Sequence, residues 1–496
     1  MTPLPNIAFD AEDGVDLAAL EGTVVVFAAA DKMLAPAATT ADRLCGGALS
    51  RAVGDAAFKG KAGVVTMVNW PAGMAARRLV LACAGEDADG AALRRVGGAV
   101  AKALAPKGAV TIATGGTAPD DMIAGFVLAV ALRLYDFREY KKPEEDAEGP
   151  PPPRSLRVLA DNAEALARES SAQMALAEGI YFTRDLVNEP ANRLTTEEFA
   201  ARLAAMQELG LEVEIMGEPE LEALGMRALL GVGQGSVTET KVVTMKWMGG
   251  GDEAPFALVG KGVVFDTGGI SLKPAAGMED MTMDMGGAGV VSGVMRTLAL
   301  RKAKANVIGV VGLVENMPDG NAQRPGDIVK SMKGDTIEII NTDAEGRLLL
   351  CDVLWHVQQA YKPSAIVDLA TLTGAVIIAL GHHRAGYYAT DDGLASDLEA
   401  ACEATGDDCW RLPLGKPYAD QLKSRKADIK NTGGRPAGSV TAAEFLHAFV
   451  EEGMPWIHID IAGVAESSGG TDLAPKGATG WGVAALDQLV RTRYEG

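Results

Sequence analysis

Short apolar runs alternate with segments of helical periodicity along the first third of the chain. Residues 22–30, 77–85 and 108–116 predict buried strands, because they are apolar, β-branched and end at small residues. Between them, residues 40–53 and 91–104 space their apolar positions as a helix does. This alternation indicates a parallel sheet with helices on its faces.

A charged, proline-rich segment separates this part from the rest. Residues 141–154 read KKPEEDAEGPPPPR, which predicts a loop or linker. A strand is predicted over 155–161 and a long helix over 162–187. Thr195 and Glu198 have the spacing of a capping box and predict the start of another helix.

The second part of the chain is again α/β and rich in glycine. Its predicted strands are 241–248, 256–259, 305–313, 336–340, 365–369 and 456–461, and its predicted helices are 289–300, 347–361 and 442–451. We therefore predict an α/β protein of two domains. A smaller N-terminal domain spans 1–168, and a larger domain with a mixed central sheet covered by helices spans 169–496.

Charge and cysteine content restrict the class of protein. The formal net charge is −20, which disfavours non-specific binding to nucleic acid. The five cysteines are widely spaced without a CxxC pair, so they indicate reduced thiols in a cytoplasmic protein. The N-terminus lacks the features of a signal peptide, and the apolar run 122–132 is too short to span a membrane.

Acidic residues, lysines and glycines gather in three segments, 260–274, 283–287 and 341–347. In the third, Asp343, Glu345 and Arg347 occupy alternate positions after a predicted strand, so extended backbone would direct them to one side. The same residues would also suit a polar turn that caps a helix, and the spacing leaves both interpretations open.

Asp266 ends an apolar run in the first segment, and Asp284 lies among methionines in the second. Together with Asp343 and Glu345, these carboxylates could neutralise two divalent cations, which in hydrolases activate water and polarise a carbonyl. Mg²⁺ or Mn²⁺ suits such oxygen ligands, and Zn²⁺ is also possible. The sequence contains no HExxH, GxSxG or GxxxxGK[ST] motif.

These segments resemble the leucyl aminopeptidases, or cytosol aminopeptidases, of the M17 type. The matching stretches are GKGVVFDTGGISLKP (260–274), MDMGGAG (283–289), NTDAEGRL (341–348), LVNEPAN (186–192) and DLATLTGA (368–375). The resemblance covers residues from about 170 onward, and it implies a metal-dependent exopeptidase that releases leucine and other apolar residues from peptide N-termini.

The resemblance also implies a role for each site residue. Asp266 and Glu345 would bridge two metals, Lys261 and Asp284 would complete one ligand set, and Asp343 would complete the other. The metals would be zinc or manganese, with magnesium possible. Lys273 would stabilise the oxyanion, and Arg347 would hold a bicarbonate ion that acts as general base. The side-chain pocket would be lined by Met281, Thr371, Gly374 and Ala462.

The resemblance further implies a homohexamer, a dimer of trimers, in which residues 1–168 have an oligomeric or regulatory role. Two alternatives stay open: a two-metal hydrolase specialised for dipeptides such as cysteinylglycine, and a DNA-binding regulator. An aspartic protease around Asp266-Thr267-Gly268 is disfavoured because the pattern is not all-β. A dinucleotide loop at 231–235 is disfavoured because the preceding segment is helical in pattern.

N-acetylated peptides are expected to be inert, because acetylation removes the free amine that the family uses as a metal ligand. The measurement compares release of leucine from a leucyl peptide and from its N-acetylated form. Ready cleavage of the acetylated peptide would contradict an exopeptidase.

Overall fold

The computed structural model describes residues 1–55, 58–85, 89–105, 107–142 and 154–495. By its internal contacts the chain divides into two compact units. One contains 1–181 with 469–476, and the other contains 182–468 with the chain from 477 onward. This division falls inside one helix, α5 (Ala163–Asn188), and the sequence-based boundary after residue 168 stays a prediction.

The first unit is built on a sheet in the order β1-β6-β5-β2-β4-β3. All neighbouring pairs are parallel except β3 with β4, which is antiparallel. The strands are β1 (Asn6–Ala11), β2 (Thr23–Ala28), β3 (Val65–Asn69), β4 (Arg78–Cys83), β5 (Val110–Ala113) and β6 (Ser155–Ala160). The helices are η1 (Leu17–Ala19), α1 (Pro36–Leu44), α2 (Ala48–Gly54), α3 (Gly90–Ala103) and α4 (Asp120–Arg133).

The single helix predicted over 40–53 is wrong, because two helices, α1 and α2, occupy this region. Gly46 and Gly47 separate them with φ of 61° and 79°, a left-handed conformation that interrupts a helix. Most of the predicted linker 141–154 lies outside the described residues. The predicted N-cap is confirmed, since the Thr195 side chain accepts a hydrogen bond from the backbone N–H of Glu198 at the start of α6 (Thr196–Ala204).

The second unit is built on a mixed sheet in the order β15-β14-β17-β13-β9-β10-β8-β7. Its strands are β7 (Glu212–Met216), β8 (Lys241–Met248), β9 (Phe256–Asp266), β10 (Asn306–Asn316), β13 (Ala365–Ala370), β14 (Ala385–Ala389), β15 (Cys409–Arg411) and β17 (Trp456–Asp460). Small sheets outside it contain β11 (Ile328–Lys330), β12 (Thr336–Glu338) and β16 (Ile429–Lys430), and β18 (Glu466–Ser467) with β19 (Gly477–Ala478).

The other helices of this unit complete the element order. They are η2 (Ala205–Leu209), α7 (Glu218–Leu224), α8 (Arg227–Gly233), η3 (Met278–Met285), α9 (Gly286–Arg301), α10 (Gly346–Tyr361), α11 (Gly374–Leu380), α12 (Asp392–Thr405), α13 (Lys416–Ala419), η4 (Asp420–Leu422), α14 (Gly438–His447) and α15 (Val483–Arg493). The predicted mixed sheet with helices is confirmed. Strand β9 is longer than the predicted 256–259 and continues to Asp266. The strand predicted over 336–340 corresponds to β12, which lies in a small sheet and not in the central one.

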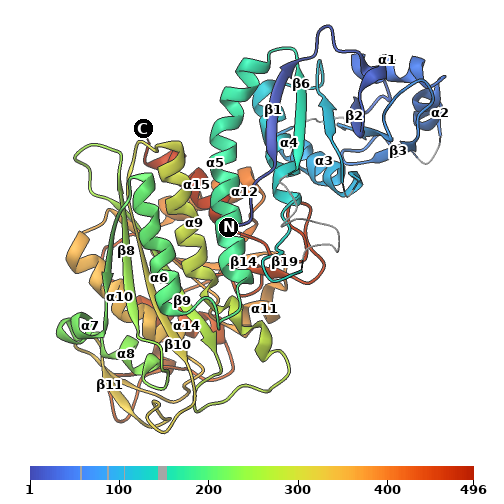
Figure 1. Ribbon diagram of the computed structural model, residues 1–496. Coiled ribbons are helices and arrows are strands. Elements are labelled where there is room, and N and C mark those ends of the chain that lie inside the picture. Colours follow the sequence, from blue (N-terminus) through green and yellow to red (C-terminus); the bar gives the residue numbers. More distant parts are fainter. Residues whose placement is uncertain (56–57, 86–88, 106, 143–153, 496) are drawn as a thin grey trace. The chain divides into compact units, whose positions relative to one another are not determined.

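Helices cover both faces of the central sheet, with α9 against one face and α10 against the other (Figure 1). Two glycines of β10 permit this close packing. A side chain at Gly309 would meet Val291 and Met295 of α9, whereas one at Gly312 would meet Leu349 and Val353 of α10. Successive strand residues alternate between faces, so each helix rests on a strip of the sheet without bulky side chains.

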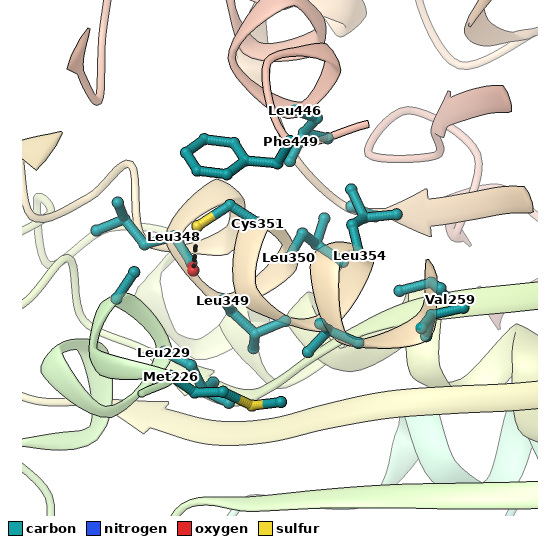
Figure 2. Close-up of a cluster of buried hydrophobic side chains, with 14 of the residues drawn as sticks. Met226, Leu229, Val259, Leu348, Leu349, Leu350, Cys351, Leu354, Leu446 and Phe449 are labelled. Atoms are coloured by element: carbon teal, nitrogen blue, oxygen red, sulfur yellow. Dashed lines mark hydrogen bonds between the residues drawn. The ribbon is translucent and has the colours of Figure 1, made fainter. Parts of the chain in front are cut away.

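The core between the sheet and α10 is closely filled with aliphatic side chains (Figure 2). Leu348, Leu349 and Leu350 are fully buried in the first turns of α10. Burial of a leucine side chain contributes about 1.5–3 kcal/mol, so this helix start is firmly held. Because Glu345 immediately precedes α10, the same packing fixes its position.

Four parallel strands end at one edge of the central sheet. The pairs β10–β9, β13–β9 and β13–β17 are parallel, with Asn316 opposite Asp266 and Ala370 opposite Asp460. Ligands of α/β proteins bind at such carboxyl ends. This edge of the sheet is therefore where the acidic segments meet.

None of the helices in the described residues combines the length and the apolar character that crossing a bilayer requires.

Gly287→Ala is expected to destabilise the second unit by about 1–3 kcal/mol, as overpacking does. A β-carbon at Gly287 would lie 2.0 Å from the backbone oxygen of Leu369, where rotation of a side chain gives no relief. The measurement is the urea midpoint of the full chain, followed by tryptophan fluorescence.

Gly289→Ala is the matched control in the same helix. Its β-carbon would meet the nearest atom, Met285 Cε, at 3.5 Å, which is an ordinary contact. This variant should be neutral or more stable by about 0.5–1 kcal/mol, because alanine favours helix over glycine. Equal midpoints for the two variants would show that α9 can move away from β13.

Candidate active site

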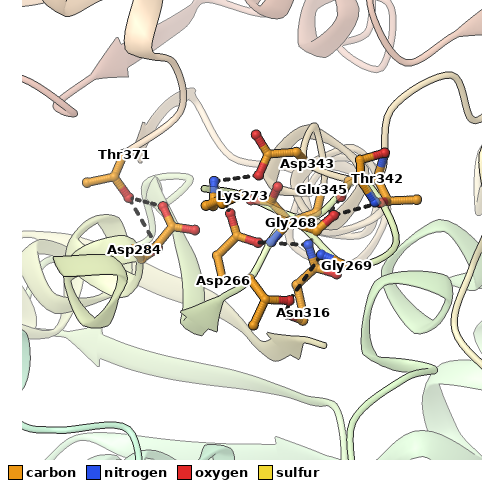
Figure 3. A network of polar contacts seen from close by, with 12 residues as sticks. Asp266, Gly268, Gly269, Lys273, Asp284, Asn316, Thr342, Asp343, Glu345 and Thr371 are labelled. Atoms are coloured by element: carbon orange, nitrogen blue, oxygen red, sulfur yellow. Dashed lines mark hydrogen bonds and ion pairs between the residues drawn. The ribbon is translucent and has the colours of Figure 1, made fainter. Parts of the chain in front are cut away.

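Acidic side chains from three separate segments converge at this edge of the sheet (Figure 3). Asp266 ends β9, Asp343 lies in the turn before α10, and Glu345 immediately precedes that helix. One carboxylate oxygen from each lies within 4.8 Å of the others. Asp284 of η3 joins them through Lys261, whose Nζ atom lies 2.7 Å from Asp284 Oδ1 and 2.8 Å from Glu345 Oε1.

The prediction that extended backbone aligns Asp343, Glu345 and Arg347 is wrong. Asp343 lies in a turn, and Glu345 has the helical angles φ −83° and ψ −36°. The two carboxylates nevertheless meet, because the turn and the first helical residues fold them toward the strand ends.

An irregularity in β9 brings Lys261 and Asp266 to the same face of the sheet. Residues five positions apart in a regular strand point to opposite faces. The pairing with β10 shifts so that Val263 faces Val314 and Phe265 faces Glu315, which leaves Val264 as an extra residue. Such a β-bulge reverses the alternation beyond it. Asp266 therefore points to the same side as Lys261.

Lys261 is buried in the middle of β9 and makes three polar contacts. Besides the two carboxylates, its Nζ donates to the backbone oxygen of Thr371 at 2.9 Å. Burial alone would lower the pKa of Lys261, but Asp284, Glu345 and Asp266 outweigh burial and raise it. A side chain at Gly346 would lie 2.7 Å from the Lys261 stem, so only glycine lets α10 begin this close.

Lys273 forms a second bridge between acidic residues. Its Nζ lies 2.8 Å from Asp266 Oδ2 and 2.5 Å from Asp343 Oδ1. The turn that carries it requires glycine, since Gly268 has φ of 85° and a β-carbon there would lie 2.8 Å from Asp343 Oδ1. Thr342 holds the turn by donating its hydroxyl to Gly268 O at 2.6 Å.

The carboxylates exceed the positive charge that the lysines provide. Burial raises the pKa of Asp266, Asp284 and Asp343, and it does so most strongly at Asp284, although the nearby lysines oppose the increase. Asp284 Oδ2 is buried and has no hydrogen-bond partner, while Oδ1 accepts from the Thr371 hydroxyl at 2.8 Å. A buried carboxylate oxygen without a partner is costly, and a metal ion beside it would offset that cost. The residues therefore fit divalent metal ions.

Arg347 lies in the first turn of α10 and is nearly buried. Its Nη1 donates to the backbone oxygen of Asn431 at 3.0 Å, whereas its Nε has no hydrogen-bond partner. Burial lowers the pKa of Arg347 to about 10, and Glu345 and Asp460 oppose this effect. A buried guanidinium with a free N–H group can bind an anion.

The four residues predicted to form a side-chain pocket lie in or next to four different elements. Thr371 follows β13, Gly374 begins α11, Ala462 follows β17, and Met281 lies half-buried on η3. The buried carboxylate of Asp460 joins two of these segments. It accepts from the backbone N–H of Leu372 at 3.1 Å and of Ala462 at 3.2 Å, and from the Thr373 hydroxyl at 2.6 Å.

Asn316 and Asp460 also shape the site, although neither was predicted from the sequence. Asn316 Nδ2 donates to Asp266 Oδ1 at 2.7 Å and to Thr342 O at 3.1 Å. Both residues end buried apolar strands, as Asp266 does. Their position as polar residues at the carboxyl ends of apolar strands could have marked them as candidate site residues.

Comparison with known proteins identifies the family. The model of the cytosol aminopeptidase catalytic domain matches residues 181–487, and that of the N-terminal domain of the same family matches residues 24–144. The chain belongs to the cytosol aminopeptidase family. Residues 24–144 lie in a part that sequence analysis did not assign by resemblance.

Relatives of this aminopeptidase are similar to it in sequence along nearly its whole length. The probable cytosol aminopeptidase of Dinoroseobacter shibae is 56% identical over 497 residues, 100% of each chain. That of Caulobacter vibrioides is 50% identical over 470 residues, 93% of this chain and 94% of its own.

Two solved structures share the fold of the aminopeptidase. A mutant of tomato leucine aminopeptidase has a TM-score of 0.86 and 28% identity and covers 99% of this chain and 97% of its own. The bottromycin maturation enzyme BotP in complex with Mn has a TM-score of 0.82 and 32% identity. The match covers 95% of this chain and 99% of the BotP chain.

The protein is thus a metal-dependent hydrolase that removes residues from peptide N-termini. Nothing in these matches supports the two alternatives, a hydrolase specialised for cysteinylglycine and a DNA-binding regulator.

Addition of Mn²⁺ to chelator-treated aminopeptidase is expected to stabilise it by about 2.7 kcal/mol at a concentration 100 times the Kd. The cation would relieve the repulsion among Asp266, Asp284, Asp343 and Glu345. The measurement is the urea midpoint with and without Mn²⁺.

Asp266→Asn should largely remove this stabilisation, since it deletes a carboxylate from the centre of the cluster. Asp327→Asn serves as the control, because the Asp327 carboxylate pairs with Arg324 and is not part of the acidic cluster, so the Mn²⁺ effect should stay intact. Stabilisation of the Asp266→Asn variant equal to that of wild type would place the cation elsewhere.

Proposed function

We propose that Lys261, Asp266, Asp284, Asp343 and Glu345 hold two divalent cations and that these side chains form the centre of peptide hydrolysis. The main support is the distance between carboxylate oxygens: one oxygen each of Asp266, Asp343 and Glu345 lies within 4.8 Å of the others. Asp284, with an unpaired buried oxygen, lies next to them. Asp266 and Glu345 are central, so both would help to hold the pair of cations. Asp343 and Asp284 lie on either side and would complete one ligand set each.

Two cations at this centre would supply positive charge that polarises a peptide carbonyl and lowers the pKa of water. The oxygen-rich donor set favours manganese or magnesium, and the Mn complex of BotP supports manganese. Zinc is the other candidate, on the resemblance to the M17 type. Lys261 can coordinate only as a neutral amine, and neighbouring cations would favour loss of its proton.

Lys273 is proposed to stabilise negative charge on the substrate oxygen. Its ammonium group lies between Asp266 and Asp343 and is only partly exposed, so little water competes for it. Once cations neutralise those carboxylates, the ammonium group is available to the substrate. Without cations, the charges of Asp266, Glu345 and Asp343 outweigh burial and raise the pKa of Lys273.

Arg347 is proposed to hold a bicarbonate ion, which would supply a proton acceptor beside the centre. The guanidinium itself stays protonated at neutral pH, since its pKa is lowered only to about 10. It would orient the anion through its unpaired N–H group.

The substrate is proposed to enter with its free amine toward Asp284 and its first side chain toward Met281, Thr371, Gly374 and Ala462. Thr371 supports this arrangement, because its hydroxyl contacts Asp284 directly and so connects the amine end with the pocket. Apolar walls favour leucine, as the name of the tomato relative suggests. One methylene group is worth only about 1–3 kcal/mol, so related apolar residues should also be accepted.

All these residues lie within 169–496, which we propose as the catalytic domain, with 1–168 in an oligomeric or regulatory role. The M17 resemblance supports a homohexamer, a dimer of trimers, located in the cytoplasm. Its substrates would be peptides with a free N-terminus.

Lys273→Ala is expected to lower kcat on leucine p-nitroanilide about 10²–10³-fold, the loss typical of one oxyanion donor. Arg347→Ala is expected to lower kcat about 10²-fold or more, the contribution of positioned proton transfer. Both variants should still bind Mn²⁺, because neither residue is a proposed ligand.

Arg301→Ala is the control for loss of a buried arginine. Arg301 pairs with Asp487 at 2.6 Å, outside the acidic cluster, so its removal should lower stability and leave kcat unchanged. Unchanged turnover after substitution of Lys273 or Arg347 would refute the role proposed for that residue.

A further inference from the structure

Asn431 is a fully buried residue next to the acidic cluster, and no step described so far uses its side chain. It follows β16, which pairs in parallel with β12 so that Lys430 lies opposite Glu338. The backbone N–H of Asn431 donates to Glu338 O at 3.0 Å. This pairing places Asn431 beside the segment that continues from β12 into the turn of Asp343.

The side-chain amide of Asn431 forms hydrogen bonds to the backbone of that segment on both sides of Asp343. Its Oδ1 accepts from the N–H groups of Ile340 at 2.8 Å and Asn341 at 3.3 Å. Its Nδ2 donates to the carbonyl oxygens of Asn341 at 2.6 Å and Ala344 at 3.3 Å. These backbone groups lie outside helices and strands, so the amide takes the place of a sheet partner.

The backbone oxygen of the same residue accepts the hydrogen bond from Arg347 Nη1 at 3.0 Å. One buried residue thus contacts the turn that carries Asp343 and the guanidinium four residues later. Its four side-chain hydrogen bonds need two acceptor and two donor directions on one short group, which an asparagine amide supplies. Aspartate has no such donors, and serine cannot reach both sides.

We infer that Asn431 is a positioning residue of the metal centre: its side chain fixes the turn of Asp343, and its backbone fixes Arg347. This inference rests on the function proposed above. Side chains that orient metal ligands from outside typically change metal affinity or activity about 10–100-fold when removed.

Asn431→Ala in the full chain tests the inference, with Asn306→Ala as the matched control. Asn306 is also buried and clamps a loop, since its amide accepts from Gly250 N at 3.0 Å and donates to Gly251 O at 2.9 Å and Glu253 O at 3.0 Å. It lies at the start of β10, whereas the site is at the end of that strand. Both substitutions remove one buried amide, but only Asn431 contacts the segment of Asp343.

Three quantities are measured for each protein: the urea midpoint, the Kd for Mn²⁺ by calorimetry on chelator-treated protein, and kcat at saturating Mn²⁺. Asn431→Ala should weaken Mn²⁺ binding about 10–100-fold and lower kcat even at saturation, because the turn that carries Asp343 is no longer fixed by the side-chain amide. Asn306→Ala should lower the midpoint and leave Kd and kcat within twofold of wild type.

If Asn431→Ala does not fold, Asn431→Ser is used in its place, because the serine hydroxyl and a water molecule can fill part of the space. Smaller changes of Mn²⁺ affinity and kcat in the same direction are then expected. Mn²⁺ affinity and kcat within twofold of wild type in the folded variant would overturn the inference. Failure of the wild-type protein to bind Mn²⁺ or to regain activity with it would instead refute the proposed metal centre.

Discussion

The structure depends on one electrostatic constraint: several carboxylates share a space that water hardly reaches. Asp266, Asp284 and Glu345 are each less than 5% exposed. Isolated charges in such a place are costly, and neighbouring like charges add to that cost. Lys261 and Lys273 offset part of it by each bridging two of the acids. The remaining negative charge is what a pair of cations would neutralise, so the feature that makes the site unfavourable when empty also gives it affinity for metal.

Close approach of backbone segments is what permits this concentration of charge. Gly268 lets the turn after β9 pass next to Asp343, and Gly346 lets α10 begin against Lys261. The apolar core under α10 holds that helix start in place, with Leu348 to Leu350 fully buried. Close packing of aliphatic side chains tolerates little displacement, so the positions of Glu345 and Arg347 are set by groups that take no part in chemistry.

Much of the fold follows from the hydrophobic pattern, because buried parallel strands, such as those predicted at 22–30 and 256–259, form continuous apolar runs. The acidic cluster could be predicted from the positions of its residues in the sequence, since Asp266 ends an apolar run and Asp343 precedes a predicted helix. Interactions with backbone atoms distant in sequence could not be predicted in this way. Asn431 binds a turn about ninety residues earlier, and no periodicity links the two. The break between α1 and α2 was missed because apolar spacing continues across Gly46 and Gly47, whose conformation overrides it.

The extra residue in β9 limits how this part of the molecule can change. Val264 can be exchanged for another side chain without disturbing the orientation of its neighbours, because orientation depends on the number of residues and not on their identity. Gain or loss of one residue between Lys261 and Asp266 would rotate one of them to the opposite face, where α9 lies. Diversification of this strand is thereby confined to replacement at constant length, whereas the loops elsewhere in the molecule are free to vary in length.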